Sequence, residues 1–364
     1  MSRMKIKDIA VQKNERVDNP SQSPYSIFVG LEHYDSGEAT IRRFGSTERL
    51  ESAMKVFHAG DMLVARRNVY LKRAATVSFD GLTSGDSIVL HIANEEIRRI
   101  IPFVLNSDDF WDYANRHADG SMSKRLSPKL LMEYEFSIPD DNLHQAADIL
   151  WAMERVKNAY RELIARTDDL VKSQFIEMTQ GTKWHQRRMG DLATYINGAA
   201  FKPKDWSRDG KPIIRIQNLN NPEAEFNYYS GVLDNKYLVN DGDVLVSWAT
   251  HLEAYIWNGP EAWLNQHIFK VVFNKGEIDK VFFIYAANVA LKEAFKMAHG
   301  FKATMEHIKR GDFENAAVMV PDIEVQRQFS EFANQSDKSK FVASNRNLSR
   351  CLGIRKRIIW DGLP

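Results

Sequence analysis

The chain has 364 residues, of which 44% are hydrophobic and 27% are charged, and its formal net charge is +1. This composition is ordinary for a soluble globular protein of two or three domains, and it excludes a global field that would attract nucleic acid. The single cysteine excludes an intramolecular disulfide. Because the N-terminus lacks a secretory signal and no apolar run could cross a membrane, we expect a cytoplasmic protein.

The first 140 residues have the sequence pattern of a mixed α/β domain. Short β-branched and aromatic runs, separated by Gly, Asp, Asn and Pro, predict strands that include Tyr25–Val29, Met62–Ala65 and Ser87–Ile92. A helix is expected over Ile97–Tyr113. We therefore place a first domain at 1–140.

A long helix is predicted next, within a segment that we place at 141–181. From Leu143 to Gln174 there is neither Gly nor Pro, and apolar residues recur at heptad spacing. Such a helix would be about 50 Å long, which favours a coiled-coil-like partner, although a core helix would show the same stripe. The residues expected at its interface are Leu143, Leu150, Met153, Tyr160, Ile164 and Val171.

The second half has the same texture. Strands are predicted at Ile213–Ile216, Val244–Trp248 and His267–Phe273, with a helix at Asp279–Ala298, so we place a second mixed domain at 182–321. The segment 322–364 is predicted to hold a second long helix, from Glu324 to Ile359. Its expected interface residues are Phe329, Phe332, Val342 and Leu352. Two such helices would pack antiparallel, because a domain separates them along the chain.

The two halves carry the same landmarks in the same order. Gly60-Asp61-Met62-Leu63-Val64 recurs 182 residues later as Gly242-Asp243-Val244-Leu245-Val246, and Ser137-Ile138-Pro139-Asp140 recurs at the same offset as Met319-Val320-Pro321-Asp322. Lys7-Asp8-Ile9 recurs as Gly190-Asp191-Leu192, and Ser26–Leu31 recurs loosely as Ile214–Leu219. We predict an α+β fold: two tandem mixed α/β domains, separated by two long antiparallel coiled-coil-like helices, in a pseudo-two-fold internal repeat. Such a chain suits a target that is itself nearly two-fold.

Motifs for catalysis are missing from this sequence. It contains no Gly-x-Gly, no Walker nucleotide motif, no Pro-Pro pair, no Glu-x-Lys, and neither His-x-x-x-His nor Cys-x-x-Cys metal spacing. We therefore expect a non-catalytic chain that holds no cofactor and no metal.

The remaining signals are typical of recognition. Both halves carry basic segments, and in the second half these are interleaved with aromatic and amide side chains that can contact phosphates or base edges. A charge run is more often a solvated face, but its presence in both copies favours DNA binding to two half-sites. The candidates are Arg42, Arg43, Arg66, Arg67, Asn68, Lys72, Arg73, Lys124 and Arg125 in the first half, and Lys202, Lys204, Arg208, Lys211, Arg215, Gln217, Asn218, Asn220 and His307 in the second.

The second half contains the stretches Ile196-Asn197-Gly198-Ala199-Ala200-Phe201-Lys202-Pro203, Gly242–Trp248 and Leu264–Val271. These stretches resemble a target-recognition domain of the specificity subunit of type I restriction–modification systems, and the resemblance extends over about residues 184–330. The first half departs from this pattern, because it has no counterpart of the Asn197–Pro203 motif.

The resemblance implies a DNA reader without catalytic activity of its own. Each domain would read half of a bipartite double-stranded target, and the two helices would set the spacer and dock two modification subunits. Those subunits would use S-adenosylmethionine to methylate adenine, and restriction subunits with ATP and Mg²⁺ would cut the DNA. Two alternatives remain open: a bivalent protein-binding scaffold, or the recognition part of another restriction–modification enzyme.

Overall fold

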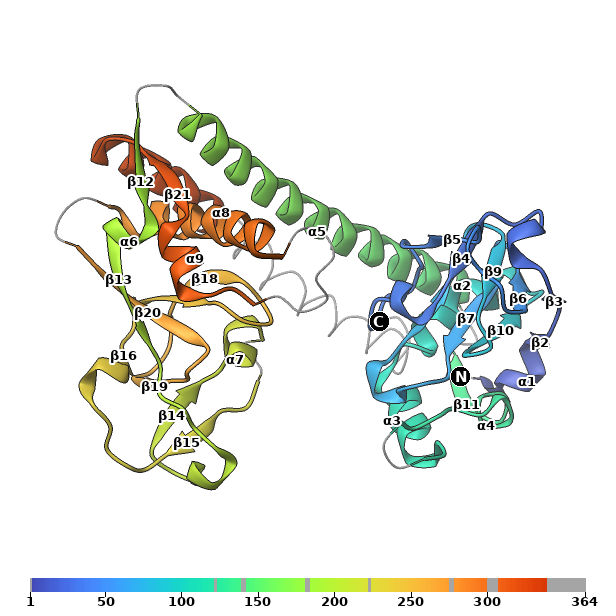
Figure 1. Cartoon of the computed structure of the whole chain (residues 1–364). Helices are drawn as coiled ribbons and strands as arrows, with labels where there is room; N and C mark the ends of the chain where they lie inside the picture. Colours follow the sequence, from blue (N-terminus) through green and yellow to red (C-terminus); the bar gives the residue numbers. More distant parts are fainter. Residues whose placement is uncertain are drawn as a thin grey trace. The chain divides into compact units, whose positions relative to one another are not determined.

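Figure 1 shows the chain as a computed structural model, which describes residues 2–120, 123–138, 142–180, 184–221, 224–274, 278–299 and 307–338. The described residues divide into two compact units, with the boundary between Glu162 and Leu163. This boundary falls inside the long helix α5 (Leu143–Thr179). The two halves of α5 are therefore built into the two units, whereas the sequence predicted a separate helical segment between the domains.

Among its described residues, the first unit combines short strands with four α-helices and three short 3-10 helices that precede α5. Its elements are β1 (Ser2–Lys5), α1 (Ile6–Ile9), β2 (Val11–Lys13), β3 (Arg16–Val17), η1 (Pro20–Gln22), β4 (Ile27–Val29), η2 (Leu31–His33), β5 (Gly45–Ser46), β6 (Met54–Phe57), β7 (Met62–Ala65), η3 (Val69–Leu71), β8 (Ala74–Thr76), β9 (Gly81–Thr83), β10 (Ser87–His91), α2 (Glu95–Val104), α3 (Asp108–His117), α4 (Pro128–Met132) and β11 (Glu135–Ile138).

The second unit contains the C-terminal half of α5 and, after α5, a similar series of elements. These are β12 (His185–Arg188), α6 (Met189–Leu192), β13 (Ala193–Asn197), η4 (Pro203–Asp205), β14 (Lys211–Ile214), α7 (Ile216–Asn220), β15 (Asn227–Tyr229), η5 (Asn235–Tyr237), β16 (Leu238–Val239), β17 (Val244–Ser247), β18 (Glu253–Ile256), β19 (Ala262–Leu264), β20 (Ile268–Phe273), α8 (Lys280–His299), α9 (Arg310–Asn315) and β21 (Ala317–Val320). Residues 323–338 form a further helix.

The sheet topology confirms the internal repeat. The order β2-β10-β7-β8 in the first unit matches β13-β20-β17-β18 in the second, and the pair β1-β11 matches β12-β21. The second sheets also correspond: β4 runs parallel to β9, as β14 does to β19. The first unit differs by one additional edge strand, β3.

Each unit has its central apolar strand buried on both faces, which explains the continuous apolar runs in the sequence. On β7, Met62 and Val64 join the core that includes the helices, whereas Leu63 and Ala65 join the core between the two sheets. On β17, Val244 and Val246 face one core while Leu245 faces the other. The alternation follows from the two-residue period of a strand.

The turn before each central strand is also repeated. Gly60 and Gly242 have φ angles of 90° and 80°, and the following carboxylates, Asp61 and Asp243, accept backbone hydrogen bonds of 2.9 and 2.8 Å. The repeated Gly-Asp pair is therefore a turn signal, since glycine adopts positive φ without steric cost.

Replacing Gly242 with alanine should lower the free energy of unfolding of the second unit by about 1–2 kcal/mol, because an L-residue is strained at this backbone conformation. A Cβ atom there would meet nothing within 4 Å, so the strain comes from the backbone alone. Urea unfolding of the variant measures the loss. An unchanged urea midpoint would show that the positive φ at Gly242 does not require glycine, and would contradict the explanation given for the repeated Gly-Asp turn.

Two sequence predictions about local structure are wrong. The helix predicted over Ile97–Tyr113 is broken into α2 and α3, because the Ser107 hydroxyl accepts the amide of Phe110 at 3.2 Å and starts a new helix. The predicted match of Ser26–Leu31 with Ile214–Leu219 is shifted by three residues. In the parallel ladders Phe28 pairs with Leu82 and Ile213 with Trp263, so Val29 corresponds to Ile214.

The apolar stripe of α5 packs into the cores of both units. Leu150 is fully buried in the first core, with Leu143 and Met153 packed against it, and Val171 is fully buried in the second. Tyr160 and Ile164, between these ends, are half-buried. The stripe therefore acts as a core helix at each end, as the simpler interpretation of the sequence allowed.

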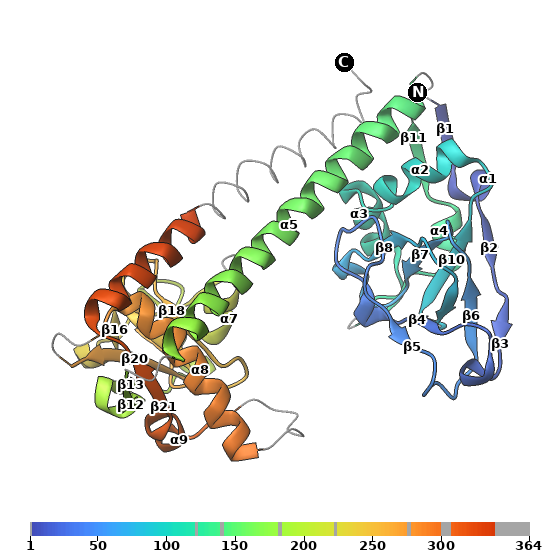
Figure 2. The same cartoon turned by 90° about the horizontal axis from the view of Figure 1, so that it is seen from above.

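The helix over residues 323–338 lies beside the C-terminal half of α5 (Figure 2). The Phe175 ring meets Phe329 at a centroid distance of 5.4 Å, and Phe332 packs against the same core. Two other predicted interface residues, Val342 and Leu352, lie outside the described residues. The second long helix was predicted to continue to Ile359, which also lies outside them.

A candidate nucleic-acid interface

Three connecting segments meet beside the central sheet of the first unit, and together we call them the first loop surface (66–73, 84–86 and 123–126). The Arg66 amide donates to the Asp86 carbonyl at 2.7 Å, and the Leu126 amide donates to the Arg66 carbonyl at 2.8 Å. A bridge pairs Arg67 with Arg125. The fold thus joins two basic segments that are more than fifty residues apart in the sequence.

The same backbone arrangement recurs in the second unit, as the second loop surface (248–252, 265–267 and 307–308). Here the Trp248 amide donates to the His267 carbonyl at 3.4 Å, and the Ile308 amide donates to the Trp248 carbonyl at 3.1 Å. A bridge pairs Ala249 with His307, 182 residues after its counterpart. Even the left-handed residue is repeated, with φ of 54° at Asn68 and 65° at Thr250.

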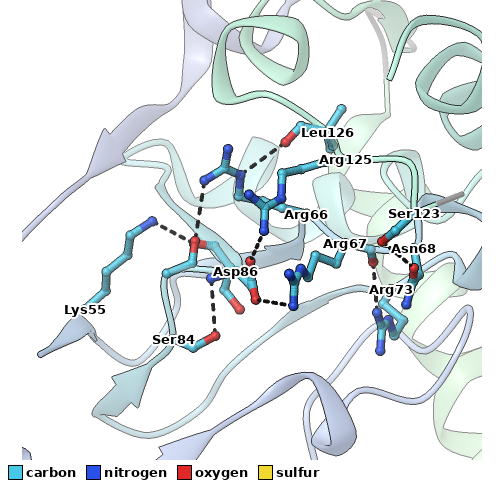
Figure 3. A network of polar contacts seen from close by, with 12 residues as sticks. Lys55, Arg66, Arg67, Asn68, Arg73, Ser84, Asp86, Ser123, Arg125 and Leu126 are labelled. Atoms are coloured by element: carbon cyan, nitrogen blue, oxygen red, sulfur yellow. Dashed lines mark hydrogen bonds and ion pairs between the residues drawn. The ribbon is translucent and has the colours of Figure 1, made fainter. Parts of the chain in front are cut away.

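Two arginines of the first loop surface share one carboxylate (Figure 3). Arg125 Nη2 donates to Asp86 Oδ1 at 3.0 Å, and Arg67 Nη1 lies 3.6 Å from Asp86 Oδ2. The side chains of Arg67 and Arg125 remain 52% and 45% exposed. The pair is therefore both held in place and accessible to a ligand.

Three further cations of this region hold backbone carbonyls. Arg66 donates to Leu126 O at 3.2 Å and Arg73 donates to Arg67 O at 2.9 Å, while the buried Lys55 donates to Ser87 O at 2.8 Å. Burial lowers the pKa of Lys55, and the charge of Arg66 lowers it further. Asn68 accepts the Ser123 hydroxyl at 2.9 Å. These hydrogen bonds hold in place the loops that carry Arg67 and Arg125.

The other predicted DNA contacts of the first half have partners elsewhere in the first unit. Arg42 lies 3.6 Å from Glu38 and 3.9 Å from Glu154, which is on α5, and both glutamates are buried. The remaining three form single contacts: Arg43 pairs with Asp35 at 2.7 Å, Lys72 pairs with Asp108 at 3.0 Å, and Lys124 donates to the Asn115 carbonyl.

A cavity of about 330 Å³ lies next to the second loop surface. Its lining combines aromatic, guanidinium and amide groups, from Phe201, Trp206, Arg215, Gln217, Gln266 and His267. Lys202, Lys204 and Arg208 are exposed in the segment that supplies Trp206, whereas Lys211 forms an ion pair with Glu261. The predicted basic run of the second half therefore lies beside this cavity.

The Arg215 guanidinium is fixed from three sides. It lies over the Trp206 ring at 5.3 Å, donates to Asn227 Oδ1 at 2.6 Å, and donates to Gln217 Oε1. A guanidinium stacked and hydrogen-bonded in this way loses little entropy when it binds an acceptor.

Asn218 and Asn220 differ in whether their side chains are accessible to a ligand. Asn218 is buried, accepts the Arg215 amide at 3.1 Å and donates to two loop carbonyls at 3.2 Å. It is a structural group that holds this loop, which differs from the predicted role in reading bases. Asn220 is exposed and accepts the Tyr255 hydroxyl, whose pKa is raised by burial and by Glu253.

The predicted His307 stands beside residues that the sequence did not single out as contacts. The Trp248 ring meets His307 at 5.0 Å and His267 at 5.2 Å, both edge to face. Trp248 and His267 belong to the motifs that carried the family resemblance, so a signal for them was present. Asp86 had no such signal, because its importance comes from arginines distant in the sequence.

Equivalent positions of the two loop surfaces carry different chemistry. The strand registers make Asp86 equivalent to His267, Arg67 equivalent to Ala249 and Arg125 equivalent to His307. The same backbone therefore presents a charged surface in one unit and an aromatic, imidazole-bearing surface in the other.

None of the described helices is long and apolar enough to cross a membrane. Among the described residues, no group of three or more His, Cys, Asp or Glu side chains could hold a metal ion.

Comparison with known proteins gives a consistent result. Residues 181–348 match the family model for the type I restriction modification DNA specificity domain. A curated relative, the specificity subunit of the type I restriction enzyme MjaVIII from Methanocaldococcus jannaschii, is 24% identical over 158 residues, which are 42% of this chain and 36% of that protein. The match therefore spans about a third of the length of that relative.

A solved structure agrees in fold. The S subunit of a type I restriction-modification system from M. genitalium has a TM-score of 0.53 and 12% identity, and the alignment covers 100% of this chain and 96% of that one. Residues 181–348 thus match the type I restriction modification DNA specificity domain, and this part of the chain is similar to a type I specificity subunit. The internal repeat extends the topology of the matched domain to the first unit.

Proposed function

We propose that this chain is the non-catalytic DNA-recognition subunit of a type I restriction–modification complex, and that each unit reads one half of a bipartite target. The observation that carries the proposal is the repeated loop surface, in which one backbone arrangement presents different side chains. A fixed scaffold with variable contact residues is what two different half-sites require, because base edges are read by side chains.

The long helices would set the spacer and dock two modification subunits. In support, Leu163 and Leu170 lie one heptad apart on α5 with 55% and 56% of their surface exposed. Exposed leucines at this spacing fit a partner helix. The modification subunits would supply S-adenosylmethionine for adenine methylation, and restriction subunits would supply ATP- and Mg²⁺-dependent cleavage.

The first test is a base-resolution methylation map of cells that carry this gene and its modification partner, compared with cells that lack only this gene. We expect adenine methylation at one split motif, lost with the gene and restored by the wild-type copy. That motif would give both half-sites and the spacer. Identical maps with and without the gene would favour a bivalent protein-binding scaffold instead.

A further inference from the structure

We propose that Arg67 and Arg125 read guanine in the half-site recognised by the first unit, and that Asp86 positions them. This inference rests on the proposed DNA-recognition function and names the base that one of its surfaces selects. The two arginines come from different loops, and both contact the same carboxylate (Figure 3).

The geometry leaves both arginines able to donate. Arg125 donates one hydrogen bond to Asp86, at 3.0 Å, and the nearest Arg67 nitrogen lies 3.6 Å from this carboxylate, whereas a guanidinium carries five N–H groups. The remaining groups match the O6 and N7 acceptors of guanine, which arginine contacts in a bidentate manner in the major groove. Anchoring at Asp86 restricts the side-chain rotamers before binding, so less conformational entropy is lost in the complex.

The carboxylate favours a base over a phosphate as the partner. Asp86 is only 28% exposed and adjoins both guanidinium groups, so an approaching phosphate would meet a negative charge at the same place. Guanine presents neutral acceptors and escapes this repulsion. A pair that served only the DNA backbone would bind more strongly without the carboxylate.

The loops beneath the pair are rigidly supported. Arg73 holds the Arg67 carbonyl at 2.9 Å, Arg66 holds the Leu126 carbonyl at 3.2 Å, and backbone hydrogen bonds join the segments. Positioning of this kind is what discrimination between bases needs, because a hydrogen-bonding pattern is selective only when its donors are fixed.

The second unit provides an internal comparison. At the positions of Arg67, Asp86 and Arg125 it carries Ala249, His267 and His307, and the two histidines flank the Trp248 ring. No carboxylate-held arginine pair is present among the described residues of the second loop surface. The inference therefore assigns guanine selection by such a pair to one half-site.

The experiment maps adenine methylation in cells whose complex contains the wild-type chain, Arg67→Lys, Arg125→Lys or Asp86→Asn. Lysine keeps the positive charge but cannot form the bidentate contact. We expect discrimination at one guanine position to fall by on the order of 10- to 100-fold in each lysine variant, with both affected positions in the same half-site. Asp86→Asn should relax both positions together.

The matched control is Arg188→Lys, which alters another exposed Arg–Asp pair, with Asp191 at 2.9 Å, outside both loop surfaces. This variant should leave the motif unchanged. An affected half-site without guanine, or a uniform fall in methylation with an unchanged motif, would overturn the inference alone. Absence of any split motif with the wild-type chain would overturn the proposed function, and this inference with it.

Discussion

Replacing Phe313 with alanine is expected to lower the free energy of unfolding of the second unit by about 3–5 kcal/mol, the usual cost of removing a buried phenylalanine ring. Phe313, on α9, is fully buried and packs edge to face on Tyr195 at 5.0 Å and parallel to Phe269 at 6.4 Å. The cavity would open between α9 and the sheet, where backbone hydrogen bonds prevent collapse.

Urea unfolding followed by tryptophan fluorescence measures this loss. The control is Met297→Ala on α8, because Met297 is 84% exposed and its replacement should change the free energy by less than about 0.5 kcal/mol. Since the two units have separate cores, the transition of the first unit should stay in place. Equal effects of the two substitutions would contradict the packing described for α9.

Glu38→Ala is expected to destabilise the first unit by about 3–5 kcal/mol, because it removes one partner from a buried ion-pair network. The Glu38 side chain is 6% exposed; it lies 3.2 Å from Lys157 and also pairs with Arg161, both on α5. The substitution would leave these cations short of a carboxylate, so α5 would lose part of its attachment to the unit. Thermal unfolding at neutral pH measures the effect.

The same carboxylate makes the stability of the first unit depend on pH. Burial opposes ionisation of Glu38, but the hydrogen bond from Arg161 and the charge of Lys157 outweigh it and hold its pKa below the ordinary value. A carboxyl group with a lowered folded pKa contributes stability above its unfolded pKa of about 4.3, and this contribution is lost as pH falls through the folded pKa. Glu38→Ala should therefore flatten the acid limb of the stability curve.

The control for this network is Asp35→Ala, which removes an exposed pair with Arg43 in the same region. The two side chains are 48% and 55% exposed, so the loss should stay below about 1 kcal/mol. If Glu38→Ala were as mild as Asp35→Ala, the network would not anchor α5.

The repeat was predictable because its signals are local. A Gly-Asp pair needs only its own turn to be recognisable, and the two copies share positive φ at Gly60 and Gly242. Apolar runs at β7 and β17 revealed central strands for the same reason. The sequence did not predict that Phe28 is equivalent to Ile213. Connecting loops of unequal length change the number of residues between equivalent positions of the two halves, so only the strand pairing shows which residues correspond.

For the candidate nucleic-acid interface, the sequence could predict which basic segments take part but not which partner each basic side chain has. Arg42 and Arg67 look alike in the sequence, yet Arg42 pairs with glutamates that include one on α5, whereas Arg67 shares Asp86 with Arg125. Partners of this kind lie dozens of residues apart in the sequence, so no local sequence pattern predicts them.

The sequence by itself determined the repeated α+β organisation, the long helix and the family resemblance of the second half, because periodicity, turns and contiguous motifs are properties of neighbouring residues. Tertiary structure alone decided which cations are buried in ion pairs, which hold loop carbonyls, and which remain exposed at equivalent places in the two units. Side-chain electrostatics depends on distance in space, and the fold, through the meeting of three loops beside each sheet, sets that distance.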